Sequence, residues 1–244
     1  MKIAALIPAR GGSKGVPRKN VRIVGPAPLL AYSITACKMS KNIDEIYVST
    51  DDVEIAKIAE RYGAKVPFIR PEQYAMDSSL DHDVIKHFFD MIDVDCVAYM
   101  RPTTPMRDPK KIDEYIDYFY SNKDKMSGLR SVQELAEPPY KMIKIEEGYC
   151  AGFFEDFEGI RDYTNLPRQT FPKAYLPNGY IDIAKRETVI NSSSAFGMKI
   201  MPVITPHIVE IDTEEDVKML KYQIDNNQHM SLIMNCSRYK SYDD

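Results

Sequence analysis

The sequence predicts an α/β protein built on a doubly wound, mostly parallel sheet, and three observations support this fold class. The chain has 244 residues, which fits one large α/β domain. Its 44% apolar residues supply a core large enough to exclude a disordered chain. Through the first half, apolar runs of strand length alternate with segments of helical period. Such a βαβα order is typical of a parallel sheet with helices on both faces.

Each element of the first half follows from its apolar pattern. Residues 3–7 form a continuous apolar run, as expected of a buried strand, whereas Ile55, Ile58 and Ala59 have helical spacing. Pro109 suits the first turn of a helix. The expected strands are residues 3–7, 46–48, 66–69 and 96–100, and the expected helices are residues 29–39, 53–62, 81–91 and 112–120.

The pattern changes between residues 131 and 177, where prolines, aromatic residues and charges mix. We expect this insert to form hairpins and loops and to serve as a dimerisation arm. The alternation then resumes, with expected strands at residues 179–183 and 199–204 and an expected helix at residues 213–224. Residues 1–228 are thus expected to form a single domain that carries the insert, and residues 229–244 a loosely held polar tail.

Charge and cysteine usage exclude several classes of protein. The 32 basic and 36 acidic side chains give a net charge of −4, which argues against a nucleic-acid partner and an anionic membrane surface. We find no apolar run near the roughly 18 residues of a membrane span. The four cysteines lie far apart in sequence, without a C-x-x-C pair. With no export signal recognisable at the start, we expect free thiols and a cytoplasmic location.

A glycine-rich, cationic loop follows the first strand directly. It runs from Arg10 to Asn20 and contains three glycines and four cations. Ligands of open parallel sheets bind at the carboxyl ends of strands, where glycine lets backbone N–H groups approach an anion and cations neutralise it. The loop therefore predicts phosphate binding, although it matches neither the P-loop pattern nor the dinucleotide fingerprint. The alternative interpretation is a flexible surface turn with solvated charges.

This loop is the first of several short motifs along the chain. They are Ile7-Pro8-Ala9-Arg10-Gly11-Gly12-Ser13-Lys14-Gly15 with Pro17-Arg18-Lys19-Asn20, Ser49-Thr50-Asp51, Arg70-Pro71-Glu72, Asp77-Ser78-Ser79, Pro102-Thr103-x-Pro105-x-Arg107, Pro167-Arg168-Gln169, Pro177-Asn178-Gly179 and residues 210–216. Together, over roughly residues 2–226, they resemble the signature of the acylneuraminate cytidylyltransferases, the CMP-sialic acid synthetases.

The resemblance implies a Rossmann-like nucleotidyltransferase domain over residues 1–228. It implies that CTP reacts with a nonulosonic, sialic-acid-like sugar to give the CMP-sugar and pyrophosphate. The anomeric hydroxyl attacks the α-phosphorus and pyrophosphate leaves in line, so the protein mainly positions groups and stabilises charge. The expected catalytic residues are Arg10, Lys14 and Lys19. The expected nucleotide-binding residues are Arg10, Gly11, Gly12, Ser13, Lys14, Lys19, Asn20, Arg70 and Ser78.

Triphosphate chemistry also implies Mg²⁺, a hard cation that takes oxygen ligands. Asp212 and Glu210 are two residues apart at an expected strand end, so their side chains share a face and are the expected metal ligands. The family usually has Asp at both positions, and Glu210 departs from that pattern. An alternative role for Asp212-Thr213 is to cap the last helix, and both roles are compatible.

The expected sugar-binding residues are Arg101, Lys141, Arg168 and Asn178. Arg168 suits a bidentate pair with the sugar carboxylate. Arg101 stands where the family commonly has Gln, which favours a modified sugar such as legionaminate or pseudaminate over N-acetylneuraminate. The alternative is that Arg101 pairs with a nearby acid, such as Asp77 or Asp108.

The implied partners are CTP or another nucleoside triphosphate and an acidic nine-carbon sugar, with no nucleic acid and no membrane. A homodimer is implied too, in which each arm completes the neighbour's sugar site. Two alternatives stay open: a nucleotidyltransferase for another triphosphate, such as GTP, or another 2-keto sugar acid, and a catalytically inactive relative that only binds nucleotides.

Overall fold

The computed structural model describes residues 2–226 and 229–237, and its centre is a six-stranded sheet in the order β10-β6-β9-β5-β1-β4. β9 is antiparallel to both of its neighbours, and every other pairing is parallel. The expectation of a mostly parallel sheet is confirmed. The strands are β1 (Ile3–Pro8), β4 (Glu45–Ser49), β5 (Cys96–Tyr99), β6 (Gly128–Glu134), β9 (Tyr175–Lys185) and β10 (Ile200–Ile204).

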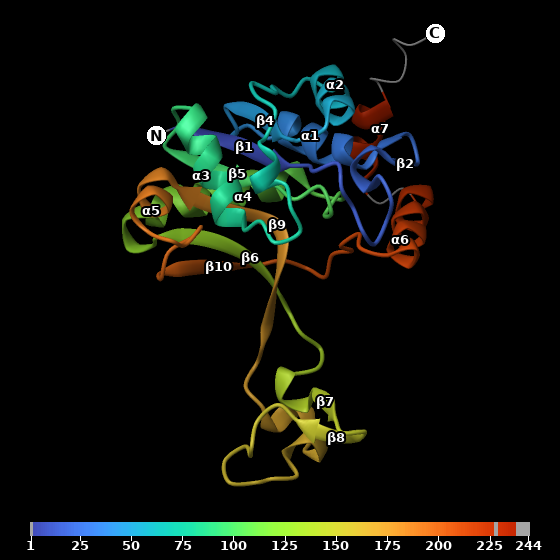
Figure 1. Cartoon of the computed structure of the whole chain (residues 1–244), viewed down its shortest axis with the longest axis vertical. Helices are drawn as coiled ribbons and strands as arrows, with labels where there is room; N and C mark the ends of the chain where they lie inside the picture. Colours follow the sequence, from blue (N-terminus) through green and yellow to red (C-terminus); the bar gives the residue numbers. More distant parts are fainter. Residues whose placement is uncertain (1, 227–228, 238–244) are drawn as a thin grey trace.

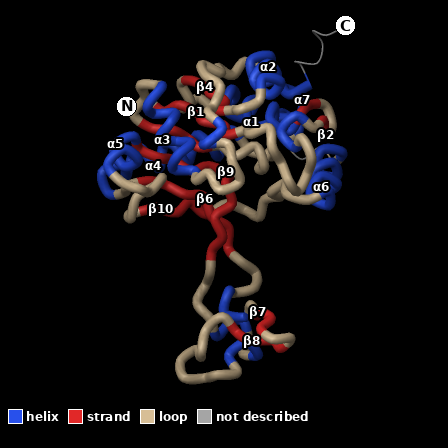
Figure 2. The backbone as a smooth tube through the Cα atoms, viewed as in Figure 1, coloured by secondary structure: helices blue, strands red, loops and turns tan. Residues whose placement is uncertain are grey.

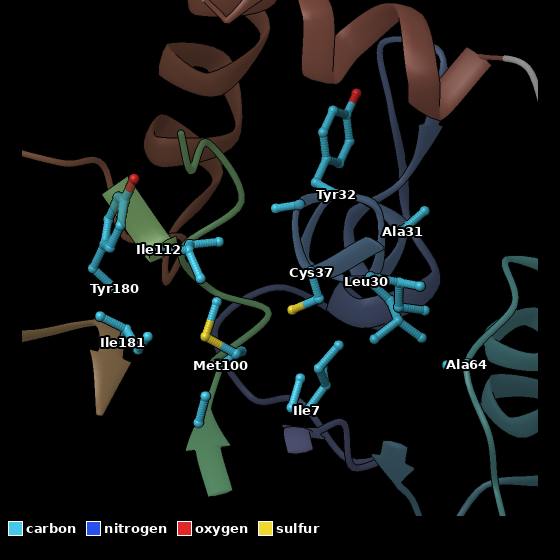
Figure 3. Close-up of a cluster of buried hydrophobic side chains, with 14 of the residues drawn as sticks. Ile7, Leu30, Ala31, Tyr32, Cys37, Ala64, Met100, Ile112, Tyr180 and Ile181 are labelled. Carbon is cyan, nitrogen blue, oxygen red and sulfur yellow. The ribbon is translucent and has the colours of Figure 1, made fainter. Parts of the chain in front are cut away.

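Helices cover both faces of this sheet, as a doubly wound fold requires. Along β1, Ile3, Ala5 and Ile7 pack with α1 and α4, whereas Ala4 and Leu6 pack with α3 and α5. Figure 3 shows part of the hydrophobic cluster on the α1 side of the sheet, where side chains of β1 and α1 meet. The helices are α1 (Leu29–Met39), α2 (Val53–Arg61), α3 (Asp81–Met91), α4 (Pro109–Asn122), α5 (Arg186–Asn191), α6 (Glu214–Asp225) and α7 (Met230–Ser237). Within the described ranges, no helix has the length and apolar character to cross a bilayer.

The structure differs from the expected secondary structure in several places. Residues 66–69 form no strand, because within this segment only Ile69 forms an isolated bridge, with Thr50 just beyond the edge strand β4. The short helix α5 was not expected. The expected tail is wrong for residues 230–237, which form α7 with Leu232 and Cys236 fully buried against α1. The spacing of four residues between these two is helical, but too short a pattern to recognise. Residues 227–228 and 238–244 lie outside the described residues.

The insert forms an arm that projects from the sheet on a two-stranded stalk (Figures 1 and 2). β6 and β9 remain paired as far as Glu134 and Tyr175, so the arm beyond the ladder is shorter than the expected insert. An aromatic cluster fills the arm, and Tyr140 stacks on Phe171 with ring centroids 5.3 Å apart. The arm contains the hairpin β7 (Ile143–Glu146) and β8 (Tyr149–Gly152).

The remaining elements are short. They are β2 (Ile23–Val24), β3 (Ala27–Pro28) and the 3-10 turns η1 (Lys19–Val21), η2 (Glu72–Tyr74), η3 (Lys123–Lys125), η4 (Pro139–Lys141), η5 (Tyr163–Asn165) and η6 (Arg168–Thr170).

Candidate active site

A cleft of about 450 Å³ opens at the carboxyl ends of β1 and β5, where ligands of open α/β sheets bind. The loop after β1 forms one wall, the segment before and at the start of α3 forms another, and residues after β5 close the third side. The expected site residues that line the cleft are Arg10, Gly12, Ser13, Lys14, Lys19, Asn20, Arg70, Arg101 and Asp212.

The cations of the loop after β1 already hold an anion of the protein itself. Arg10 Nη2 lies 2.6 Å from Asp77 Oδ1, and Lys14 Nζ lies 2.5 Å from Asp77 Oδ2. Lys14 first and Arg10 second lower the pKa of Asp77, so this carboxylate stays charged beside them. The two cations thus form an anion-binding pair of the type that a phosphate group requires.

Internal hydrogen bonds shape the loop. Asn20 is buried and donates from Nδ2 to the Arg10 carbonyl at 2.9 Å. The Gly11 N–H donates to Asp51 Oδ1 at 2.9 Å, so it faces the end of β4 rather than the cleft. Gly11 is therefore not among the described residues that line the cleft, whereas Gly12 is. Asn20 and Gly11 hold the backbone that presents Arg10 to the cleft.

Lys19 joins this loop to the segment after β10. Its Nζ donates to the Ile211 carbonyl at 2.7 Å and lies 2.8 Å from Asp212 Oδ1. Gly15 leaves no room for a side chain, because a Cβ there would overlap the Asp212 carbonyl oxygen. The close approach of the two segments therefore depends on this glycine.

The two expected metal ligands lie near each other, but not on a strand. Residues 210–212 are irregular, which corrects the expected strand end. The Ile211 N–H donates to the Thr103 carbonyl at 2.8 Å, and Thr103 Oγ1 donates to Glu210 Oε1 at 3.1 Å. Burial, with a contribution from Asp212, raises the pKa of Glu210. Thr213 caps α6 in a capping box with Asp216, so the alternative role in helix capping is present as well.

This donor set fits Mg²⁺ only together with a substrate. The described residues contain no group of three or more His, Cys, Asp or Glu side chains arranged around a metal position. Mg²⁺ is commonly held by one or two carboxylates and the phosphates of a substrate, so Asp212, which lines the cleft, meets the requirement from the protein side, whereas Glu210 is not among the described lining residues.

The side chain of Arg70, a guanidinium, is almost fully buried at the cleft, and the backbone N–H of Arg70 donates to the Thr50 carbonyl at 2.7 Å. Burial lowers the pKa of this guanidinium, and its Nε has no hydrogen-bond partner among the described residues. Such a buried donor is costly unless a ligand satisfies it. Ser78, expected beside it, is exposed, and Ser79 lines the cleft instead.

Arg101 faces the cleft from the end of β5 and pairs with Asp81, Nη2 to Oδ2, at 2.5 Å. The expected alternative of an acid partner is thus right in kind, but Asp77 and Asp108 were the wrong acids. Asp77 pairs with the loop cations, and Asp108 caps α4.

Arg107, the last residue of the Pro102-Thr103-x-Pro105-x-Arg107 motif, supports this side of the cleft from the interior of the protein. It is fully buried, and its Nη2 donates to the carbonyls of Arg101 and Gly179, at 2.8 Å each. A fully buried arginine that binds backbone carbonyls fixes the course of the chain after β5. Nothing in the local pattern of residues signals this role.

The other expected sugar-binding residues lie elsewhere. Asn178 is buried and donates from Nδ2 to the Thr205 hydroxyl at 2.6 Å, so its side chain points into the protein. Lys141 and Arg168 belong to the arm, where Lys141 donates to the Leu166 carbonyl at 2.8 Å. None of these three is among the described residues that line the cleft.

The sheet, the cationic loop at its carboxyl edge and the paired carboxylates after β10 define a nucleotide-binding α/β protein of the nucleotidyltransferase type. A sequence profile described as cytidylyltransferase matches residues 4–146. The chain belongs to this cytidylyltransferase family, and it is a nucleotidyltransferase by fold and family.

Two relatives illustrate the membership. Over 236 residues the chain is 33% identical to the CMP-N,N'-diacetyllegionaminic acid synthase of Legionella pneumophila, with 93% of this chain and 98% of that protein covered. Over 239 residues it is 30% identical to the N-acylneuraminate cytidylyltransferase of Escherichia coli O18:K1:H7, with 96% of this chain covered. The chain spans 55% of the length of this second relative.

A solved structure agrees with the fold. It is that of a CMP:2-keto-3-deoxy-manno-octonic acid synthetase complexed with CTP, which superposes with a TM-score of 0.71 at 15% identity. The match covers 93% of this chain and 100% of the other. At this identity the likeness shows a shared fold.

Proposed function

We propose that this protein transfers CMP from CTP to the anomeric hydroxyl of a nonulosonic acid and releases pyrophosphate. The observation that carries the proposal is the cleft itself: Arg10 and Lys14 share one carboxylate, and Lys19 and Asp212 lie beside them. The two relatives named above, whose names specify sialic-acid-like sugars, support this class of acceptor.

The phosphate-binding step follows from the ion pairs of the loop. A triphosphate carries more charge than Asp77 and replaces it as the counter-anion of Arg10 and Lys14. Lys19 stands at the junction with the segment after β10, where it balances negative charge on the phosphate chain. These cations are fixed before the substrate arrives, so they stabilise the charge that develops on pyrophosphate as it leaves.

Mg²⁺ is part of the proposal, with Asp212 and Glu210 as the residues that would hold it together with phosphate oxygens. When bound, the ion neutralises phosphate charge. The pair between Lys19 and Asp212 keeps this carboxylate at the mouth of the cleft before binding. Thr103 orients Glu210 through its hydroxyl.

A homodimer completes the proposed sugar site. Lys141 and Arg168 do not line the cleft of their own chain within the described residues, but they sit on a projecting arm with exposed apolar side chains such as Ile145 and Tyr149. An exposed apolar surface of this kind is typical of protein contacts. The arm of a second copy therefore supplies these two cations to the sugar carboxylate. Thiols that form no disulfide among the described residues, together with the use of CTP, favour a cytoplasmic setting.

A pyrophosphate-release assay tests the function. The purified protein is incubated with each of the four ribonucleoside triphosphates and, in turn, N-acetylneuraminate, N,N'-diacetyllegionaminate and pseudaminate. We expect release with CTP and at least one sugar acid, and loss of release when EDTA removes Mg²⁺. Release with GTP in place of CTP would contradict the base assignment. No release with any pair would contradict the catalytic role.

A further inference from the structure

Asp81 lies in the wall of the cleft, and nothing in the phosphate chemistry uses it. It is the first residue of α3, and its side chain is 35% exposed. The Tyr99 hydroxyl donates to Oδ1 at 2.9 Å, and Arg101 Nη2 donates to Oδ2 at 2.5 Å. Each oxygen of this carboxylate thus has one donor that fixes its position.

The two donors leave acceptor capacity on the cleft side. A carboxylate offers roughly four lone-pair positions, and Tyr99 and Arg101 occupy one on each oxygen. Burial raises the pKa of Tyr99 well above its usual value, so its hydroxyl keeps the proton that it donates. Asp81 is therefore a preorganised acceptor rather than a solvated surface charge.

Arg101 is itself held in place. Its aliphatic stem packs on Gly179, which has φ +62°, and a Cβ at Gly179 would lie 2.5 Å from Arg101 Cδ. Asp182 on β9 is fully buried nearby, and its register partner on β5 is Tyr99. Burial lowers the pKa of Arg101, but attraction to the Asp81 carboxylate and other nearby acids outweighs burial, so the pKa is raised. The ion pair with Asp81 and the packing on Gly179 thus fix the guanidinium in place.

The position and the charge of Asp81 determine which part of the substrate it can contact. Arg70 adjoins the end of β4, the cationic loop follows β1, and Asp81 adjoins the end of β5 on the far side of β1. A carboxylate repels both the triphosphate and the carboxylate of the sugar acid. A neutral hydroxyl or amide N–H of the sugar is the group that suits it.

We propose that Asp81 is a specificity-determining residue that accepts a hydrogen bond from a hydroxyl or amide N–H of the acceptor sugar. Tyr99 and Arg101 are positioning residues that hold it. The inference rests on the proposed function and names the group that reads the sugar.

Kinetics of Asp81→Asn test the inference, with Asp83→Asn as a matched control. Asp83 is on the same helix, approaches His82 at 3.4 Å and is absent from the described cleft lining. Asparagine preserves size and removes the charge of the acceptor. We expect kcat/KM for the sugar acid to fall about 10- to 100-fold, as for a hydrogen bond to a charged group, with KM for CTP within about twofold. Asp83→Asn should match the wild type.

Analogues of the sugar distinguish direct recognition of the sugar by Asp81 from a merely structural role of this residue. Deoxy and N-methylated derivatives of the accepted sugar are compared in the wild type and in Asp81→Asn. The wild type should discriminate strongly against one derivative, and Asp81→Asn should lose that discrimination. Tyr99→Phe, which leaves the carboxylate intact, should lower kcat/KM for the sugar by a few-fold and keep the discrimination.

Three outcomes would overturn the inference. They are an unchanged sugar kcat/KM in a folded Asp81→Asn, an equal loss on every derivative, and a shift confined to KM for CTP, which would place Asp81 at the nucleoside. If Asp81→Asn fails to fold, unchanged kinetics in Tyr99→Phe would overturn it. A wild type that turns over no sugar acid would instead refute the proposed function, and the inference would fall with it.

Discussion

Replacing Arg107 with Met should destabilise the protein strongly, because this side chain is fully buried and hydrogen-bonded. All five N–H groups of this guanidinium have acceptors. Nε donates to the Tyr180 carbonyl at 2.6 Å, Nη1 donates to Ser33 Oγ at 2.8 Å and also to the Thr104 carbonyl, and Nη2 donates to two further carbonyls. Burial lowers the pKa of Arg107 to about 10, so it remains protonated at neutral pH.

The size of the effect follows from the acceptors that Met would leave behind. Met fills a similar volume but donates no hydrogen bond, so four backbone carbonyls lose their donor. Removing one partner of a buried charged network costs about 3–5 kcal/mol. At about 2–4 °C per kcal/mol for a chain of this size, the melting temperature should fall by about 10 °C.

Thermal unfolding followed by circular dichroism measures this shift. Arg161→Met, at an exposed position on the arm, is the matched control and should melt with the wild type. Arg107→Lys should recover part of the loss, because an ammonium donates three hydrogen bonds. A fall of less than about 2 °C in Arg107→Met would refute the reasoning that the segment after β5 depends on this side chain.

Three further variants and one measurement test the rest of the site. Lys19→Ala should cut kcat by about 100-fold or more, since it removes a charged phosphate contact, and should lower the melting temperature only slightly, since the Ile211 carbonyl loses one donor; near-normal turnover would contradict the phosphate role. Asp77→Asn should lower KM for CTP, because it frees the two loop cations, and the effect should shrink as salt is raised. Gly15→Ala should raise KM for CTP by pushing the loop away from Asp212, and unchanged kinetics would show that the approach is not needed. Light scattering at micromolar concentration should give a dimer, and a monomer there would contradict the proposed role of the arm.

The fold could be predicted in most of its parts because its elements are locally encoded. α3 begins and ends at the residues expected from its apolar spacing, and Asp108 with Pro109 mark the start of α4. α7 was missed because its burial depends on a partner, α1, that is distant in sequence. A helix of only eight residues is too short for its apolar spacing to be recognised in the sequence.

The candidate site shows the same division. The loop after β1 was recognisable, since glycines and cations are adjacent in sequence and their chemistry does not depend on the rest of the chain. Asp81 was not, because it looks like Asp83 until β5 brings Tyr99 and Arg101 beside it. The inward turn of Asn178 depends likewise on Thr205, which is 27 residues away. The ligands of Lys141 and Arg168 stay predictions.

The ladder between β6 and β9 makes the arm a replaceable module. Its last rungs pair Glu134 with Tyr175, and the Leu135 N–H donates to the Ala174 carbonyl at 2.9 Å, so the two ends of the arm are tied together before it leaves the body. The cost of closing such a loop grows only with the logarithm of its length. Insertions and deletions in the arm should therefore disturb the cleft little. The arm, with any sugar-binding residues that it carries, can change in evolution while the nucleotide site stays the same.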